Sequence, residues 1–236
     1  AGLTNAYQLQ TFYDQAETKS FAAGQTLLVE GPPSFDGVMV YLTGQVQVVA
    51  NGTEHKDLEP FAVIGDRALV FGEQPVTLTA RVPTEVLVLR RGLLDALFGE
   101  ELQKVFMRSR LLSLLTQHRV FSRLHEDQRE AVVDCCEVVS LPVDEELCSE
   151  DLRFAAVLHG EVEARTQEDG PSPEIRRYSG AVASSIGEEN LQQRGVPWEI
   201  RVRAVGNGGS AHLAVWRGKD LDKILTFDDL DHAIEQ

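Results

Sequence analysis

The segment VIGDRALVFGEQPVTLTARV, residues 63–82, decides how the rest of the chain is interpreted. A glycine and an acid open it, an Ala-Leu step typical of a short helix follows, and a second glycine and a proline precede a β-rich exit. Glycine and proline at such positions predict a tight loop. The layout is typical of a loop that surrounds an anion, yet no arginine lies in its middle.

Acidic residues dominate the charged part of the chain. Its 236 residues include 37 Asp and Glu against 22 Lys and Arg, which gives a formal net charge of -15. Such a charge repels phosphate-rich surfaces unless a basic patch is segregated from it. The longest basic runs are the pairs Arg90-Arg91 and Arg176-Arg177. We therefore expect no nucleic-acid partner.

The apolar and cysteine content indicates a cytoplasmic protein. No apolar run approaches the ~18 residues that a membrane-crossing helix needs, and no signal-peptide pattern opens the sequence. The odd count of three cysteines, two of them adjacent at Cys135 and Cys136 and the third at Cys148, argues against a disulfide framework. Neither Cys nor His residues follow zinc-ligand spacing, so we expect no metal and no other cofactor.

Two halves of the chain repeat one pattern. The stretch FAAGQTLLVEG (21–31) leads to VMVYLTGQVQVVA (38–50), and LPVDEELCSED (141–151) leads to FAAVLHGEVEAR (154–165). After a glycine, each second stretch alternates apolar and polar residues, as half-buried strands do. Each half ends on an apolar strand and an Arg-Gly pair, in VLVLRRG (86–92) and LAVWRG (213–218). This repetition predicts two copies of one β-rich domain.

Helices are expected around both copies. Residues 100–115 place Leu102, Val105, Phe106, Leu112 and Leu115 on one face at helical spacing. Residues 125–139 begin with acids in the first turn, which favours a helix N-terminus. These two helices bridge the copies. A lead-in helix near residues 6–18 and a C-terminal helix over residues 220–236 complete the expectation.

The order of these elements resembles tandem cyclic-nucleotide-binding domains, as in the regulatory parts of cyclic-nucleotide-dependent protein kinases. The resemblance covers nearly the whole chain and implies a mainly β fold with flanking helices. It implies two β-roll (jelly-roll-like) domains, residues 1–118 and 119–236, joined by a helical bridge. Bacterial transcription regulators share the domain but carry a DNA-reading helix-turn-helix, and no basic recognition helix is found in this sequence.

The resemblance makes the opening segment a phosphate-binding cassette, which in this family reads Gly-Glu-x-Ala-Leu…Pro-Arg-x-Ala-Thr. The family Glu accepts hydrogen bonds from the ribose, and the family Arg neutralises the cyclic phosphate. The carried-over ligand-binding positions, with one residue of slack in the register, are Gly65, Asp66 for the Glu, Ala68, Leu69, Pro75, Val76 at the Arg position, and Thr77.

The second cassette allows two alignments. Spacing to the exit strand favours Gly187-Glu188 as the Gly-Glu pair, with Pro197 as the proline and Trp198 at the arginine position. Local similarity instead favours Gly180-Ala181. We give slight preference to Gly187-Glu188, and neither alignment places an arginine at the family position.

The absence of an arginine at the family position in both cassettes lowers the affinity that we expect for a phosphate-bearing ligand. A charge-assisted hydrogen bond to phosphate contributes roughly 1.5–3 kcal/mol, so its loss weakens binding about ten- to a hundredfold. We therefore expect no ordinary high-affinity binding of cyclic AMP or cyclic GMP. Val76 suits an uncharged nucleoside, an exchange that kinetoplastid relatives of the protein kinase A regulatory subunit have made. For the second domain we favour a cassette that is retained only for the fold.

The expected role is that of a regulatory or sensory module without catalysis. The six histidines are scattered and no nucleophile-base setting is found. The family implies a protein kinase catalytic subunit or domain as the partner. The alternative is a scaffold built on two ligand-free domains. A third hypothesis keeps weak cyclic nucleotide binding through Arg81, Arg194 or Arg201. The Arg-Arg-x-Ser sequence at 176–179 also matches a basophilic kinase consensus, which recurs by chance.

Overall fold

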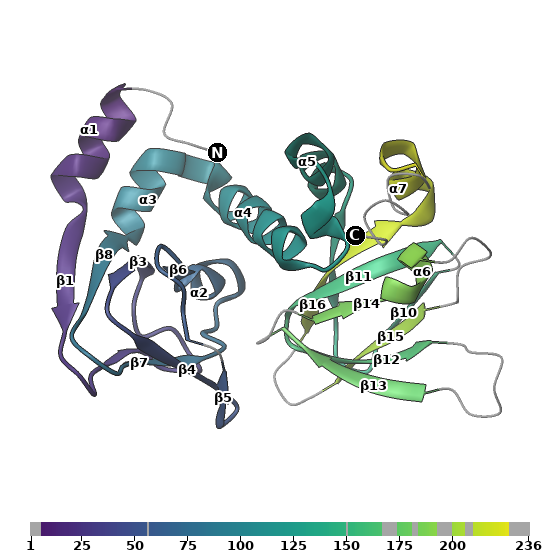
Figure 1. Cartoon of the computed structure of the whole chain (residues 1–236), viewed down its shortest axis with the longest axis horizontal. Coiled ribbons are helices and arrows are strands. Elements are labelled where there is room, and N and C mark those ends of the chain that lie inside the picture. Colours follow the sequence, from purple (N-terminus) through teal and green to yellow (C-terminus); the bar gives the residue numbers. More distant parts are fainter. Residues whose placement is uncertain are drawn as a thin grey trace. The chain divides into compact units, whose positions relative to one another are not determined.

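The computed structural model describes residues 6–55, 57–149, 151–166, 174–180, 184–192, 200–205 and 210–226. The chain forms two compact units, Ala1–Ser109 and Arg110–Gln236, shown in Figure 1. The dividing point lies inside helix α4 (Leu102–Gln117), whereas the boundary expected from the sequence, 118/119, follows the end of that helix. Across the described residues, no helix combines the length and apolarity that crossing a bilayer would require.

Unit 1 contains two four-stranded antiparallel sheets. The order of the first sheet is β1-β8-β3-β6 and that of the second is β2-β7-β4-β5. The strands are β1 (Glu17–Phe21), β2 (Thr26–Leu28), β3 (Gly37–Thr43), β4 (Val46–Ala50), β5 (Thr53–His55), β6 (Val63–Ile64), β7 (Thr77–Ala80) and β8 (Thr84–Arg90). The predicted alternation places Val46, Val48 and Ala50 inward, and one apolar cluster joins residues of both sheets.

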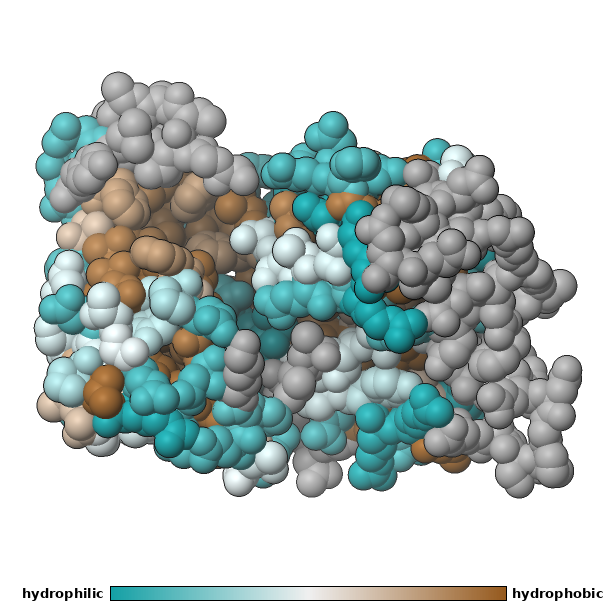
Figure 2. Space-filling model, viewed as in Figure 1, coloured by the Kyte–Doolittle hydropathy of each residue, from teal (hydrophilic) through white to brown (hydrophobic). Residues whose placement is uncertain are grey.

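Helices flank the sheets of unit 1. They are α1 (Ala6–Gln15), α2 (Asp66–Phe71), α3 (Arg91–Phe98), a 3-10 turn (Gly99–Glu101) and the beginning of α4. A second apolar cluster joins Val38 of β3, Leu94 of α3 and Leu102 of α4, with Leu69 of α2 packed against it. Figure 2 shows apolar surface gathered over the α3 region of this unit.

Unit 2 repeats the same arrangement strand for strand. Its sheets have the orders β14-β11-β16-β9 and β10-β15-β12-β13. The strands are β9 (Glu137–Leu141), β10 (Glu146–Ser149), β11 (Leu152–His159), β12 (Glu161–Thr166), β13 (Glu174–Ser179), β14 (Ser184–Ile186), β15 (Ile200–Val205) and β16 (Ala211–Arg217). The predicted tandem repeat of a mainly β domain is thereby confirmed.

The helices of unit 2 correct one prediction. They are α5 (Glu126–Asp134), a 3-10 turn (Phe121–Arg123), α6 (Glu188–Gln192) and α7 (Gly218–Ile224), besides the end of α4. The helix predicted over 125–139 ends at Asp134, because residues from Glu137 onward pair with β16 as strand β9. Valines 138 and 139 suit a strand. Cys135 is the C-cap of α5, not an interior residue. Of the predicted C-terminal helix, residues 227–236 lie outside the described residues.

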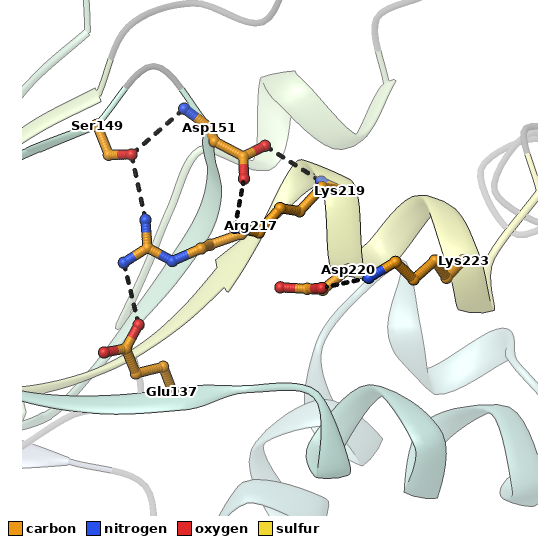
Figure 3. Close-up of polar contacts among 7 residues, drawn as sticks. All are labelled: Glu137, Ser149, Asp151, Arg217, Lys219, Asp220 and Lys223. Carbon is orange, nitrogen blue, oxygen red and sulfur yellow. Dashed lines mark hydrogen bonds and ion pairs between the residues drawn. The ribbon is translucent and has the colours of Figure 1, made fainter.

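A polar network fixes the junction between β16 and α7 (Figure 3). Arg217 donates to Ser149 Oγ at 3.3 Å and to Glu137 Oε2 at 3.0 Å, which joins three strands. Asp151 accepts the backbone N–H of Lys219 at 3.1 Å, so its carboxylate satisfies an N–H group of the first turn of α7. In unit 1, the matching Arg90 pairs with Glu17 at 3.8 Å.

Candidate functional site

The first cassette begins with a glycine whose backbone only glycine adopts readily. Gly65 follows β6 with φ 88°, and a Cβ there would lie 3.0 Å from the carbonyl oxygen of Gly37. Helix α2 starts at the next residue and ends where Gly72, φ 76°, donates its N–H to Ala68 O at 3.0 Å. Glycine, acid, short helix and second glycine therefore follow one another as the sequence predicts.

The acid of this cassette has no partner among the residues that the structure describes. Asp66 is the first residue of α2 and is half-buried. Within the described part of the chain, its carboxylate takes part in no hydrogen bond and no ion pair. Its acceptor oxygens are therefore available to a donor from outside the protein.

The end of the cassette is apolar where the family carries an arginine. Val76 is half-buried and packs against the core cluster of unit 1, and Pro75 before it is also half-buried. Thr77 begins β7, and its Oγ1 accepts the backbone N–H of Glu30 at 3.0 Å. Residues 74–77 include no Lys or Arg, so this segment itself supplies no cation at this end of the loop.

Sequence analysis missed Gln74, the residue before the cassette proline. Its backbone N–H and C=O both pair with Gly31 at 2.8 Å. The side chain is 4% exposed and donates from Nε2 to Val76 O at 3.1 Å. Its Oε1 is buried without a hydrogen-bond partner among the described residues, which is costly for a polar atom. A glutamine beside a turn gives no sequence signal that its side chain is buried and bonded to the loop.

Arg81 is engaged away from the loop. It forms ion pairs with Glu54 and, at 3.5 Å, with Asp57. Gln45 and Gln47 hold the same two acids through hydrogen bonds of 2.6 and 2.8 Å. These contacts commit the guanidinium to the turn region around β5, so the geometry does not favour Arg81 as a replacement for the cassette arginine.

Gly187, the glycine expected to open the second cassette, has the backbone geometry of Gly65. This residue has φ 88°, the value found at Gly65, and lies between β14 and α6 as Gly65 lies between β6 and α2. Gly180 instead follows β13, and its N–H bonds Gly160 O at 2.8 Å. Gly187-Glu188 is thus the geometric equivalent of Gly65-Asp66. Ala181, Arg194, Pro197 and Trp198 lie outside the described residues.

The acid of the second cassette is occupied from within the protein. Glu188 Oε1 accepts a hydrogen bond from Ser185 Oγ at 2.6 Å and lies 3.2 Å from His118 Nε2. His118 Nδ1 accepts the N–H of Val120 at 3.2 Å, which leaves the ring proton on Nε2 to be donated to Glu188. The histidine therefore ties the end of α4 to the second cassette.

His118 is 8% exposed and lies in an aromatic cluster. Its ring centroid is 5.0 Å from that of Phe121 and 5.1 Å from that of Phe154. Trp216 extends the cluster and donates to Val132 O at 2.7 Å. Burial lowers the pKa of His118 and outweighs the nearby carboxylate of Glu188, which acts in the opposite direction. The neutral imidazole described above is the form this environment favours.

In the described part of the chain, the remaining reactive groups do not form a site. Burial raises the pKa of Cys135 to about 11 and that of Cys136 to about 12, so both thiols are poor nucleophiles at neutral pH. Among the described residues, no three His, Cys, Asp or Glu side chains are grouped so that they could hold a metal ion.

Comparison with known families matches residues 18–101 to the family model of the cyclic nucleotide-binding domain. This part of the chain is a cyclic nucleotide-binding domain. The match contains the first cassette and ends at the start of α4. The repeated topology of unit 2 places the same architecture after the cyclic nucleotide-binding domain.

Among curated proteins, the chain is similar to cGMP-dependent protein kinases. It is 29% identical over 167 residues to the enzyme of Eimeria tenella, covering 64% of this chain and 16% of the kinase. It is 27% identical over 150 residues to that of Plasmodium berghei (strain Anka), covering 61% and 17%. Both matched shares of this chain exceed either unit alone, so the similarity reaches into both. The chain spans about a sixth of these relatives, and it resembles the regulatory regions of kinases.

Solved structures with a similar chain trace include the regulatory domain of Toxoplasma gondii PKA with cAMP. The identity is 19%, with 98% of this chain and 89% of the other covered at a TM-score of 0.42. Another is the regulatory subunit of a cAMP-independent protein kinase A from Trypanosoma cruzi bound to guanosine. The values there are 12% identity, 98% and 79% coverage, and a TM-score of 0.43.

Proposed function

We propose that unit 1 senses an uncharged purine ligand such as a nucleoside, and that unit 2 is held by its own contacts without a ligand. The observation that carries this proposal is the unpartnered carboxylate of Asp66 in a cassette whose arginine position holds Val76. The site residues are those of the first cassette: Gly65, Asp66, Ala68, Leu69, Pro75, Val76 and Thr77.

The choice of an uncharged ligand follows from the two ends of the cassette. A carboxylate accepts hydrogen bonds from ribose hydroxyl groups, as Asp66 is free to do. A phosphate beside Val76 would instead lose water without gaining a cation, which is unfavourable in a partly buried site. A nucleoside has the ribose hydroxyl groups that can bond Asp66, and it has no phosphate to place beside Val76.

Apolar contacts connect the cassette with the helices that follow it. Leu69 of α2 packs against Leu94 of α3 and Leu102 of α4, and Phe98 and Phe106 pack against the same cluster. Because packed clusters shift between discrete arrangements, ligand binding that moves α2 would change how the beginning of α4 packs. We assign the module a non-catalytic regulatory role toward a kinase catalytic domain in the cytoplasm, as the similarity to cGMP-dependent protein kinases suggests.

The test is calorimetric titration of the full chain with adenosine, guanosine, inosine, cyclic AMP and cyclic GMP. We expect a nucleoside to bind and the cyclic nucleotides to bind at least about tenfold more weakly. Asp66→Ala should abolish the nucleoside signal, and the matched variant Glu188→Ala should retain it. Tighter binding of cyclic AMP than of every nucleoside would overturn the choice of ligand.

A ligand-free role for unit 2 rests on a different observation. His118 and Ser185 already occupy Glu188, so a ribose would have to displace both. Unit 2 would then serve as an interaction surface. If no compound binds the chain at all, the scaffold hypothesis replaces the sensor for both units.

A further inference from the structure

The first cassette buries one polar side chain. Of residues 66–77, only Gln74 is buried, and the others are half-buried or exposed. Its Nε2 donates to Val76 O at 3.1 Å, whereas its Oε1 has no hydrogen-bond partner among the described residues. A backbone carbonyl can only accept, so Val76 O fixes which atom of the amide is the nitrogen. The unpaired group of Gln74 is therefore an acceptor.

This acceptor lies beside the position that holds the arginine in the family. The two polar atoms of one amide are close neighbours, so Oε1 lies near the Val76 backbone to which Nε2 is bonded. Val76 packs against the core cluster of unit 1, which also contains Leu28. Leu28 Cδ1 in turn lies 3.8 Å from the position that a Cβ of Gly65 would take. Both ends of the cassette thus border the same cluster.

The contacts of the protein itself leave this acceptor without water and without a donor. Such a buried polar atom is unfavourable, and most buried polar atoms in proteins are paired. Thr84 shows the usual case in this chain, because its buried Oγ1 donates to Val82 O at 2.8 Å. A ligand that brings a donor to the Val76 end of the cassette would remove the cost, and one that brings only acceptors would not.

We propose that Gln74 Oε1 accepts a hydrogen bond from the 5′-hydroxyl group of a nucleoside, and that this contact selects a nucleoside over a cyclic nucleotide. The proposal rests on the function proposed above for unit 1. The 2′- and 3′-hydroxyl groups of a ribose are neighbours, so the two carboxylate oxygens of Asp66 can accept from both. The 5′-hydroxyl group then remains for the other end of the cassette.

A cyclic nucleotide cannot make the contact with Gln74. Its 5′ oxygen is esterified to the phosphate and carries no proton to donate. The phosphate oxygens would instead place acceptors next to an acceptor, and Val76 offers no cation in compensation. Gln74 and Val76 therefore act in the same direction, the first by favouring a hydroxyl group and the second by giving a phosphate nothing to pair with.

The hydroxyl group reaches Oε1 when the end of the cassette moves. Gln74 is 4% exposed, whereas Pro75 and Val76 beside it are half-buried and reach solvent. Shifting these two residues uncovers the amide. The covered arrangement keeps Oε1 unpaired, so a ligand that pairs with it offsets part of the cost of the shift.

The experiment is a thermodynamic cycle between the amide and the ligand hydroxyl group. Titration calorimetry of the full chain compares adenosine, guanosine and inosine with the 5′-deoxy and 3′-deoxy analogue of each. In the wild type, we expect removal of the 5′-hydroxyl group to weaken binding about tenfold. In Gln74→Met, which keeps the length of the side chain without its amide, the same removal should weaken binding less than about twofold.

Two controls accompany the cycle. Gln47→Met removes an amide that bonds Glu54 on strand β4, outside the cassette, and should keep the tenfold effect of the 5′-hydroxyl group. The 3′-deoxy analogue should lose the same affinity in the wild type and in Gln74→Met, because the 3′-hydroxyl group is assigned to Asp66. Circular dichroism checks that both variants fold.

Urea denaturation without any added compound tests the amide independently of the proposed function. Because Oε1 is unpaired, Gln74→Met should leave the midpoint unchanged or raise it. A lower midpoint would show that the amide is satisfied within the protein, and it would overturn the proposal.

The remaining outcomes separate this proposal from the proposed function. If a nucleoside binds but loses the same affinity without its 5′-hydroxyl group in the wild type and in Gln74→Met, this proposal alone fails, as it would if a buried water satisfied Oε1. A cycle that shows coupling with the 3′-hydroxyl group instead would also overturn it. Binding of no compound, or tighter binding of cyclic AMP or cyclic GMP than of every nucleoside, would overturn both.

Discussion

The two cassettes share their backbone and differ in what their acids contact. Both begin with a glycine at φ 88° and continue into a short helix whose first residue is an acid. Asp66 has no partner among the described residues, whereas Glu188 is held by His118 and Ser185. One repeat therefore keeps an acceptor available, and the other uses the equivalent acceptor to fasten its own parts together.

The two cassettes therefore have the same loop conformation but different chemistry. The glycine conformation and the helix are set by backbone sterics and packing, which both repeats need. The contacts of the acid depend on which donor lies next to it, and among the described residues a buried histidine lies there in unit 2 and not in unit 1. In unit 1, an aliphatic cluster around Val38, Leu94 and Leu102 lies beside α2, with no hydrogen-bonding side chain among these residues.

Removing the histidine should have the largest effect. We expect His118→Ala to lower the free energy of unfolding by about 2–4 kcal/mol, because it leaves a cavity in the aromatic cluster and removes the hydrogen bonds of the imidazole to Glu188 and Val120. Asp66→Ala should change it by no more than about 0.5 kcal/mol. Urea denaturation of both variants, followed by circular dichroism, which reports on the strands of both units, makes the comparison. Equal losses would show that the two acids are not differently engaged.

Restoring the family arginine should change ligand preference next. Val76→Arg should raise the affinity for cyclic AMP about ten- to a hundredfold, the reverse of the loss inferred for its absence. The control Thr79→Arg places a charge on the same strand, on the outward face. Titration calorimetry compares the two variants. A gain in the control alone, or in neither, would contradict the assignment of Val76.

The buried imidazole predicts a pH dependence confined to unit 2. The pKa of His118 lies below its ordinary 6.5 in the folded chain, so the unfolded chain binds the proton first as pH falls. Stability should therefore decrease below pH 6.5, by at most about 1.4 kcal/mol per pH unit from this group. Thermal unfolding between pH 7.5 and 5 should show a shallower slope for His118→Gln than for the wild type. Burial also lowers the pKa of His212. This residue therefore adds a pH dependence of stability to the wild type and to His118→Gln alike.

Replacing the matched arginines before α3 and α7 should give the smallest difference in stability between the two units. Arg217→Ala should cost about 1 kcal/mol, because its guanidinium bonds Ser149 and Glu137 and its side chain is 31% exposed. Arg90→Ala should cost less than about 0.5 kcal/mol, since the pair with Glu17 is long and its side chain is 67% exposed. Equal values would mean that the extra hydrogen bond contributes nothing.

The repeated fold could be predicted because its signals are local. Alternation at 45–48 and 161–164, glycines at strand ends and the Arg-Gly pairs each occupy a few consecutive residues, and the strands form where these patterns predict. The limit of α5 was missed because Val138 and Val139 fit a helix face as well as a strand. Pairing with β16 decides between the two, and pairing is not a local property.

The contacts that distinguish the two cassettes could not be predicted. Glu188 and His118 are 70 positions apart, and no periodicity relates them. The arginines on the second sheet of unit 2 are a similar case, because they are not neighbours in the sequence. Only the pairing of β12, β13 and β15 brings residues 165, 177, 201 and 203 onto one surface.

Helix α4 has a practical consequence for dissecting the protein. The two units meet between Ser109 and Arg110, inside a continuous helix. A cut there would break the i to i−4 hydrogen bonds that cross that position and expose a new terminus in the middle of the helix. Each half expressed alone should therefore retain Leu102–Gln117 in full.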